Sequence, residues 1–314
     1  MKRSNSKKYI FILLLVLLGV VIQSAYYADI PFETLKQKYA NEFSKFVEID
    51  QMQVHYRDEG EGEVIVLIHG TGASLHTWDE WTETLKQFYR VVRLDLPAFG
   101  LTGANSNGDY SITYYTSFIQ NFLKTINIDS CYMVGNSLGG NIAWNYAVDY
   151  PENIKKLILV DASGLPTGKS QPWIFKLAKT PVLNSIVLYF TPKIIIKKNL
   201  EQVYEDDLKI TEGLVNRYHE MSLREGNRKA FIDRAKTDFN LTDSNNINRL
   251  PKVTSPTLII WGEKDSWIPL ENGKQMDNLI PNSELVVIKN SGHVPMEENS
   301  IESVELVLEF LIKN

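Results

Sequence analysis

Short apolar runs alternate with stretches of helical spacing along most of the chain. The runs are continuously apolar, which is typical of strands buried on both faces of a parallel sheet. Two earlier segments, 46–50 and 53–57, alternate apolar and polar residues like half-exposed strands joined by a short turn. The alternation predicts an α/β fold, with a mostly parallel twisted sheet and helices on both of its faces. The apolar runs lie at 64–68, 91–95, 131–134, 157–161, 257–261 and 285–288, and the helical stretches at 78–88, 112–126 and 301–312.

Residues 166–245 interrupt this alternation. They contain several stretches of helical spacing and no buried strand, which predicts a helical cap or lid inserted after the strand at 157–161. The α/β core then comprises residues 46–165 and 246–314. Within and just before the cap, residues 162–200 carry six lysines and no Asp or Glu. A solvated helical surface is the simplest interpretation, and a lid that rests on an anionic bilayer is the alternative.

The N-terminal segment has the pattern of a targeting or anchoring sequence. Basic residues without any acid precede an apolar run at 9–22, which predicts either a signal peptide or a single membrane span. Cleavage after Ala25 or Ala28 would lack a small residue three places before the cut, so an uncleaved anchor over 1–28 is expected. The basic end should stay cytoplasmic, which places the α/β domain outside the cytoplasm, in the periplasm of a Gram-negative cell.

Two alternatives remain for this segment: secretion after cleavage, and a helix packed on the domain. Residues 29–45 are expected to form a polar, partly helical connector.

Composition excludes several classes of function. The 314 residues carry a net charge of −5, so no basic surface indicates a nucleic-acid partner. Cys131 is the only cysteine, which excludes an internal disulfide and a cysteine zinc cluster, and its place in a buried strand indicates a core residue. The histidines lack metal-binding spacing, so we expect no metal and no cofactor and interpret His55, His76 and His219 as structural or surface residues.

A strand, a sharp turn and a helix surround Ser137 in the sequence Gly135-Asn-Ser137-Leu-Gly139. This G-x-S-x-G pattern is typical of a nucleophile elbow, in which the serine hydroxyl stands clear of the sheet on a strained turn. Glycines flank the serine because a Cβ there would collide with the neighbouring strand or helix. The pattern is short enough to arise by chance, so its interpretation depends on finding a base, an acid and an oxyanion hole.

Two further loops supply the base and the acid. Asp265 follows the run at 257–261, and His293 follows the run at 285–288. Ligands of open α/β sheets bind beyond the carboxyl ends of the strands, so these loops should meet Ser137 there. His293 would take the serine proton and Asp265 would orient the imidazole. Asp161 also ends a strand and is the alternative acid.

Two backbone N–H groups are expected to stabilise the oxyanion. One belongs to Leu138, directly after the serine, and the other to Thr71 in the loop after the strand at 64–68. Gly70 and Gly72 would let this loop approach the substrate, and His69 would order it through hydrogen bonds.

The chain resembles serine hydrolases of the α/β-hydrolase fold. The resemblance extends from about residue 46 to the C-terminus and rests on the HG loop at Gly70, DLPAFG at 95–100, GNSLGG, WGEKD and SGHVP. It implies a triad of Ser137, Asp265 and His293. The N-terminal segment and HGTGASLHTW resemble bacterial membrane-associated lipases and esterases. Ala98 departs from the family, in which glycine is usual, and only a small local change is expected.

The first functional hypothesis is a membrane-anchored hydrolase of small-molecule or lipid carboxylic esters that works through an acyl-enzyme. A C–C bond hydrolase for the diketones of ring cleavage shares the triad and the GNS sequence. A cofactor-free haloperoxidase shares the triad as well. A non-catalytic binding protein on a hydrolase scaffold is the remaining alternative, and the complete triad argues against it.

Overall fold

The computed structural model describes residues 6–237 and 244–313 and contains one eight-stranded sheet in the order β1-β2-β4-β3-β5-β6-β7-β8. The first two strands pair antiparallel as a hairpin, β2 pairs antiparallel with β4, and all other neighbours are parallel, as the continuous apolar runs predict. The strands are β1 (Ser44–Ile49), β2 (Met52–Glu59), β3 (Val64–Ile68), β4 (Arg90–Leu94), β5 (Cys131–Asn136), β6 (Ile154–Val160), β7 (Thr257–Gly262) and β8 (Ser283–Ile288).

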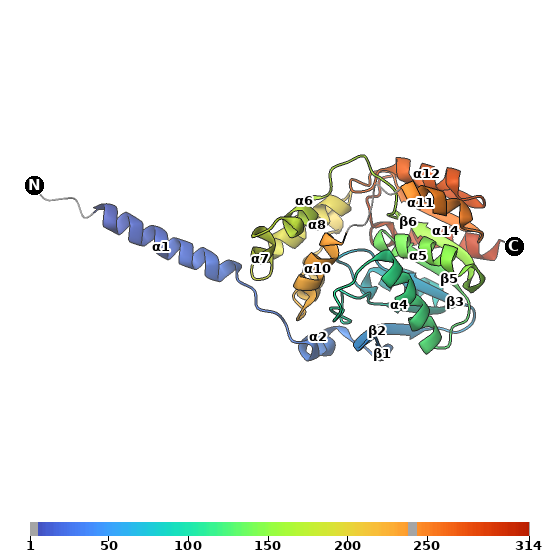
Figure 1. Cartoon of the computed structure of the whole chain (residues 1–314), viewed down its shortest axis with the longest axis horizontal. Coiled ribbons are helices and arrows are strands. Elements are labelled where there is room, and N and C mark those ends of the chain that lie inside the picture. The colour runs from blue at the N-terminus through green and yellow to red at the C-terminus, as the bar shows by residue number, and fades with distance from the viewer. Residues whose placement is uncertain (1–5, 238–243, 314) are drawn as a thin grey trace, which may run out of the picture.

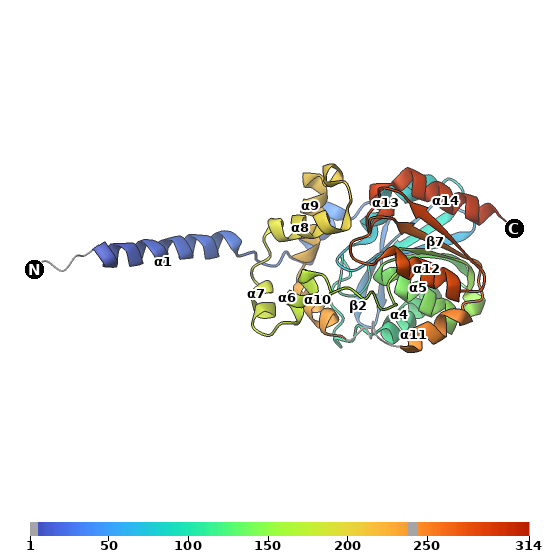
Figure 2. The ribbon, with the colours of Figure 1, turned by 90° about the horizontal axis from the view of Figure 1, so that it is seen from above.

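Helices cover both faces of the sheet, so its central strands are buried (Figure 2). On one face, Trp78 and Trp81 pack with Val304 and Val307 in a continuous apolar cluster. On the other face, a larger cluster joins α4, α5 and α12 to the strands, and Cys131 belongs to it as the sequence predicts. The helices of the first face are α3 (Asp79–Leu85) and α14 (Ser300–Ile312), and those of the second are α4 (Ile112–Thr125), α5 (Leu138–Asp149) and α12 (Leu270–Leu279).

The segment between β6 and β7 contains helices and, in its described part, no strand of the sheet. Its helices gather at one end of the molecule, beyond the carboxyl ends of the central strands (Figures 1 and 2). We call these helices the cap. They are α6 (Trp173–Lys179), α7 (Leu183–Val187), α8 (Lys193–Val203), α9 (Glu212–Ser222) and α10 (Asn227–Lys236), followed by α11 (Ser244–Arg249) beside the core.

The N-terminal helix α1 (Ser6–Ala25) projects away from the rest of the molecule (Figure 1). The sequence predicts that this segment spans a membrane. In the part of the chain that the structure describes, no helix combines the length and apolar character needed to cross a membrane, so the predicted transmembrane anchor is not supported.

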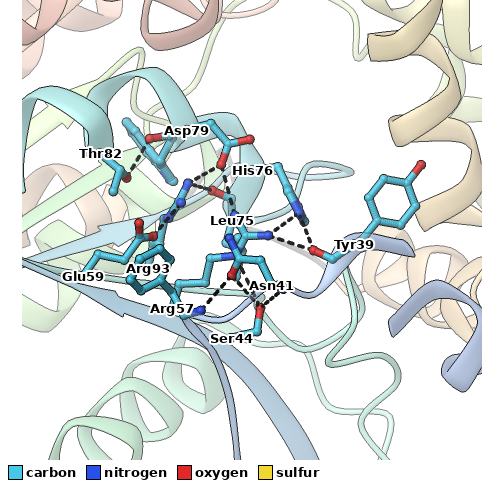
Figure 3. Close-up of polar contacts among 12 residues, drawn as sticks. Tyr39, Asn41, Ser44, Arg57, Glu59, Leu75, His76, Asp79, Thr82 and Arg93 are labelled. Atoms are coloured by element: carbon cyan, nitrogen blue, oxygen red, sulfur yellow. Dashed lines mark hydrogen bonds and ion pairs between the residues drawn. The ribbon is translucent and has the colours of Figure 1, made fainter. Parts of the chain in front are cut away.

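The expected connector at 29–45 is docked on the molecule through apolar contacts as well as polar ones. Its helix α2 (Phe32–Tyr39) buries Leu35 against Leu101 and Met221. A polar network then ties the end of α2 to the sheet (Figure 3). Arg57 donates to the carbonyl oxygen of Tyr39 at 2.8 Å. Asp79 accepts from Arg93 at 2.5 Å and lies 3.4 Å from Arg57, so one carboxylate joins two strands to α3.

Candidate active site

Ser137 lies at the turn between β5 and α5 in a strained backbone conformation, with φ of 53° and ψ of −113°. The turn is possible because the flanking glycines allow close backbone approach. A Cβ on Gly139 would lie 2.1 Å from the carbonyl oxygen of Ile68, and one on Gly135 would lie 2.2 Å from the carbonyl oxygen of Gly139. Since real Cβ atoms do not approach backbone so closely, only glycine fits either position. The sequence pattern therefore corresponds to a real elbow.

His293 and Asp265 lie together in the loops that follow β8 and β7. The Nδ1 atom of His293 lies 2.6 Å from Oδ2 of Asp265, and both side chains are buried. The other carboxylate oxygen of Asp265 accepts hydrogen bonds from the backbone N–H groups of Trp267 and Ile268, at 2.8 and 3.0 Å. These contacts hold the carboxylate in a single orientation toward the imidazole, leaving Nε2 as the nitrogen that can take a proton.

The Nε2 atom of His293 is buried and makes no hydrogen bond to any described residue. Asn136, which precedes the elbow serine, donates to the backbone carbonyl oxygen of His293 at 3.0 Å and so ties the two loops together. Proton transfer from Ser137 would require its hydroxyl to come within hydrogen-bond reach of Nε2. Such contacts are commonly longer in ligand-free hydrolases and tighten when substrate binds.

Asp161, the alternative acid, lies beside Asp265 and makes no hydrogen bond to His293 in the described part of the chain. One of its oxygens accepts from the backbone N–H of Gly262 at 2.9 Å. Complete burial, together with the nearby negative charge of Asp265, raises the pKa of Asp161 well above its usual range. The hydrogen bond of 2.6 Å to His293 is made by Asp265, and the raised pKa of Asp161 favours its neutral form beside that carboxylate.

A metal ion could be held by a group of His, Cys, Asp and Glu side chains whose ligand atoms lie close together. Among the described residues there is one such group, Asp161, Asp265 and His293, with ligand atoms within 4.8 Å of one another. However, the Asp265 and His293 atoms are already at hydrogen-bond distance. Ligands of a common zinc ion, each about 2.0 to 2.2 Å from it, lie farther apart than this. The spacing thus fits an acid–base pair better than a metal site.

The loop after β3 brings Thr71 next to the elbow. Thr71 and Leu138 line the same cavity as Ser137, and within the described residues no hydrogen bond uses either backbone N–H group. A Cβ on Gly70 would lie 3.1 Å from the Cβ of Ser137, so this position must be small. Gly72 has a φ of 76° and open space around it. Two unused donors therefore lie beside the serine.

His69 holds this loop in place, as its predicted supporting role requires. Its Nδ1 donates to the carbonyl oxygen of Gly70 at 2.7 Å, and its Nε2 accepts from the backbone N–H of Leu96 at 3.0 Å. Burial lowers the pKa of His69 and keeps the ring neutral, which is the form that these two bonds need.

The other three histidines are buried and hydrogen-bonded, so they are structural rather than surface residues. His55 lies 2.8 Å from Oδ2 of Asp95, His76 contacts Arg57, and His219 lies 2.7 Å from the carbonyl oxygen of Thr191. Burial lowers the pKa of His76 to about 3.

Ala98 has a φ of 84°, a region that favours glycine. This explains why glycine would be usual there. The backbone N–H of Ala98 still donates to the carbonyl oxygen of Gly103 at 2.7 Å, so the turn is retained with alanine.

Two cavities meet at the site. The first, which we call the serine cavity, contains Ser137 and has two basic side chains in its wall, Lys179 and Arg234. The second, which we call the apolar cavity, lies between the cap and the loops of Thr71 and Phe99. They share Thr71, Phe175 and Trp267. Cap side chains that line the apolar cavity include Ile174, Leu177, Val187, Phe190, Ile195 and Leu200.

Sequence reasoning missed most of these lining residues. Trp267 follows Asp265 closely in the chain. Its ring lies 5.5 Å from that of His293, and it forms a wall of both cavities. Phe175 contacts Trp267 where the two cavities meet, with ring centroids 5.8 Å apart. The sequence shows that the segment containing Phe175 is apolar, but it does not show that Phe175 lines the cavities.

Comparison with known proteins places the chain in context. A family model described as the alpha/beta hydrolase fold matches residues 63–300. The chain is 30% identical over 287 residues to a 2-hydroxy-6-oxononadienedioate/2-hydroxy-6-oxononatrienedioate hydrolase of Pseudomonas sp., covering 86% of this chain and 97% of that relative.

Two solved structures are also similar. A meta-cleavage product hydrolase of Pseudomonas fluorescens IP01 has 27% identity and a TM-score of 0.74, covering 86% of this chain and 98% of its own. A membrane phospholipase A, described as a bacterial virulence factor, has 26% identity and a TM-score of 0.71, covering 97% of this chain and 98% of its own. The names of the Pseudomonas sp. relative and of the meta-cleavage product hydrolase support C–C bond hydrolysis, the second hypothesis from the sequence, more directly than the ester hydrolysis expected first.

Proposed function

The chain belongs to the alpha/beta hydrolase fold family, and from that premise we propose that it is a serine hydrolase that cleaves carboxylic esters with apolar acyl groups. The observation that carries the choice of substrate is the apolar cavity, which continues from the serine cavity into the cap and is lined mainly by aliphatic and aromatic side chains. An acyl chain is the kind of group that such a wall stabilises, because binding removes its apolar surface from water.

In the proposed mechanism, Oγ of Ser137 attacks the ester carbonyl carbon while Nε2 of His293 takes its proton. Asp265 stabilises the resulting imidazolium. The backbone N–H groups of Thr71 and Leu138 bind the oxyanion, each contributing about 10²–10³ in rate. His293 then gives its proton to the leaving alcohol, and the acyl group stays on Ser137 until water, activated by the same imidazole, releases it as a carboxylic acid.

A second candidate is C–C bond hydrolysis of a 2-hydroxy-6-oxo-dienoate. The names of two similar proteins, a 2-hydroxy-6-oxononadienedioate hydrolase and a meta-cleavage product hydrolase, support it. Such a substrate carries a carboxylate. Lys179 and Arg234 in the wall of the serine cavity supply positive charge that suits one. The same triad would serve both reactions, so the choice between them rests on the substrate that the cavities accept.

Residues 166–245 would act as the cap that selects the substrate in either case. The predicted location of the catalytic domain outside the cytoplasm stays a prediction from the sequence.

The deciding experiment compares p-nitrophenyl esters from acetyl to palmitoyl with a 2-hydroxy-6-oxo-dienoate, using the full chain. We expect ester turnover with a kcat/KM that rises with acyl length as the apolar cavity fills. Ser137→Ala should lower kcat by about 10⁴-fold or more. Ser170→Ala is the matched control, because Ser170 lines the serine cavity without a role in the chemistry.

Turnover of the dienoate without ester turnover would refute the ester proposal in favour of the second candidate. Failure of a fluorophosphonate probe to label Ser137 in the folded chain would refute a serine hydrolase of either kind.

A further inference from the structure

A surface on the outside of the cap carries exposed apolar side chains, and we propose that it docks onto an anionic lipid bilayer. This cap surface consists of Val182, Leu183, Ile186, Tyr189 and Ile194, whose side chains are 42–74% exposed. Its residues lie on or next to α7 and at the start of α8, within thirteen positions of one another in the chain. The inference does not depend on which bond the enzyme cleaves.

Apolar exposure of this kind is concentrated on the cap. Elsewhere in the described body of the protein, exposed large hydrophobic residues such as Phe43, Phe88 and Ile301 are separate in the chain. Single exposed apolar residues are normal on protein surfaces, whereas a group of them marks a place where another apolar phase or partner binds. The cap surface is such a group.

The charges around the cap surface identify the partner. The lysines at 169, 176, 193, 197 and 198 are all exposed, and residues 162–200 contain no acidic residue. The whole chain has a net charge of −5, so this positive segment contrasts with the rest. Exposed apolar side chains with exposed lysines close by in the chain match the boundary between the acyl chains and the headgroups of an anionic bilayer. A second copy of the chain would bring like charges together and is disfavoured.

The cap surface is also continuous with α1. The ring of Tyr26, just after α1, lies 6.5 Å from that of Tyr189 and 6.4 Å from that of Phe190. The backbone N–H of Tyr27 donates to the carbonyl oxygen of Tyr189 at 3.0 Å. Helix α1 carries exposed apolar side chains from Tyr9 to Val16 and leaves the molecule at the end where α7 lies (Figures 1 and 2). Both apolar features can therefore meet one lipid surface.

The apolar cavity lies directly behind the cap surface. Val187, Phe190 and Ile195 line that cavity, and each is the chain neighbour of an exposed residue of the cap surface. Docking would thus place lipid against the outer side of the helices whose inner side faces the candidate active site. An apolar substrate could pass from the bilayer to the cavity without crossing water.

The test uses the full chain with vesicles of phosphatidylcholine alone or with 30 mol% phosphatidylglycerol. An environment-sensitive fluorophore is attached at Ile186→Cys, or at Leu208→Cys as the matched control, because Leu208 is exposed on the cap segment but outside the cap surface; the native Cys131 is buried. We expect a blue shift and protection from iodide quenching at position 186 on anionic vesicles, and neither change at position 208. Each of Lys193→Glu and Lys198→Glu should weaken vesicle binding at least about fivefold.

Vesicle-bound chain with position 186 still open to iodide would overturn the proposal, because α1 alone would then hold the chain. Unchanged vesicle binding by Ile186→Asp together with a changed sedimentation mass would also overturn it and identify a second copy as the occupant.

Discussion

The buried carboxylate of Glu298 joins the loop of His293 to the cap, and replacing it with glutamine tests this connection. One oxygen of Glu298 accepts the backbone N–H of Gly292 at 2.7 Å. The other accepts the backbone N–H groups of Glu205 and Asp206, at 2.9 and 2.7 Å. Gly292 immediately precedes His293, whose own N–H donates to the cap residue Val203 at 2.7 Å.

The cost of Glu298→Gln follows from these three bonds. The amide keeps one acceptor oxygen, so its NH₂ group must face either the Gly292 donor or the pair at Glu205 and Asp206. The less costly arrangement leaves Gly292 unsatisfied, at about 1–3 kcal/mol. The remaining bonds lose their charge assistance, which adds about 1 kcal/mol. We therefore expect a destabilisation of about 2–4 kcal/mol.

Urea unfolding followed by tryptophan fluorescence and by circular dichroism measures this loss, and the two probes together show whether the cap unfolds separately. The kcat for a p-nitrophenyl ester should fall by about tenfold to 10²-fold, since small displacements of a catalytic base are costly. Glu302→Gln makes the same chemical change at an exposed position of α14 and should alter neither quantity. A change in stability below about 0.5 kcal/mol with an unchanged kcat would contradict this account of Glu298.

Two further predictions concern the buried acid and the elbow. Burial and the charge of Asp265 raise the pKa of Asp161, so the folded protein keeps a proton that the unfolded chain releases above about pH 4. The wild-type protein should therefore lose stability relative to Asp161→Asn as pH rises from about 4 toward the raised pKa. Thermal unfolding of both proteins over this pH range measures the difference, and a difference that does not vary with pH would contradict the prediction. Gly139→Ala places a Cβ 2.1 Å from the Ile68 carbonyl oxygen and should cost at least about 1–3 kcal/mol in urea unfolding. Gly213→Ala, in an open position of α9, should instead be neutral or stabilising by up to about 1 kcal/mol, and equal effects of the two substitutions would refute the steric argument.

The strands, their order of appearance and the three loops of the candidate triad could be predicted because each depends on local pattern. Continuous apolar runs identify buried parallel strands, and Gly135 and Gly139 identify a turn that tolerates no Cβ. The sequence also favoured Asp265 over Asp161 as the acid. In the structure Asp265 is the one of the two that contacts His293, at 2.6 Å, and its catalytic role stays a prediction.

The sequence predicted a helical cap at 166–245 but could not show its shape. Phe175 and Trp267 are about ninety positions apart, and only the docking of the cap on the core brings their rings to 5.8 Å. Nothing in the sequence distinguishes Glu298 from other acidic residues, because two of its three donors, Glu205 and Asp206, are more than ninety positions away.

By itself, then, the sequence determined the α/β sheet and the strand, turn and helix around Ser137, since backbone sterics and hydrophobic periodicity act between near neighbours. It also put forward the candidate base and acid, whose roles stay predictions. Only the tertiary structure decided that Asp161 is buried beside Asp265, that two cavities meet at Trp267, and that the connector at 29–45 is docked on the molecule. These features depend on contacts between residues far apart in the chain, whose geometry is set by packing of the whole fold and leaves no local signal.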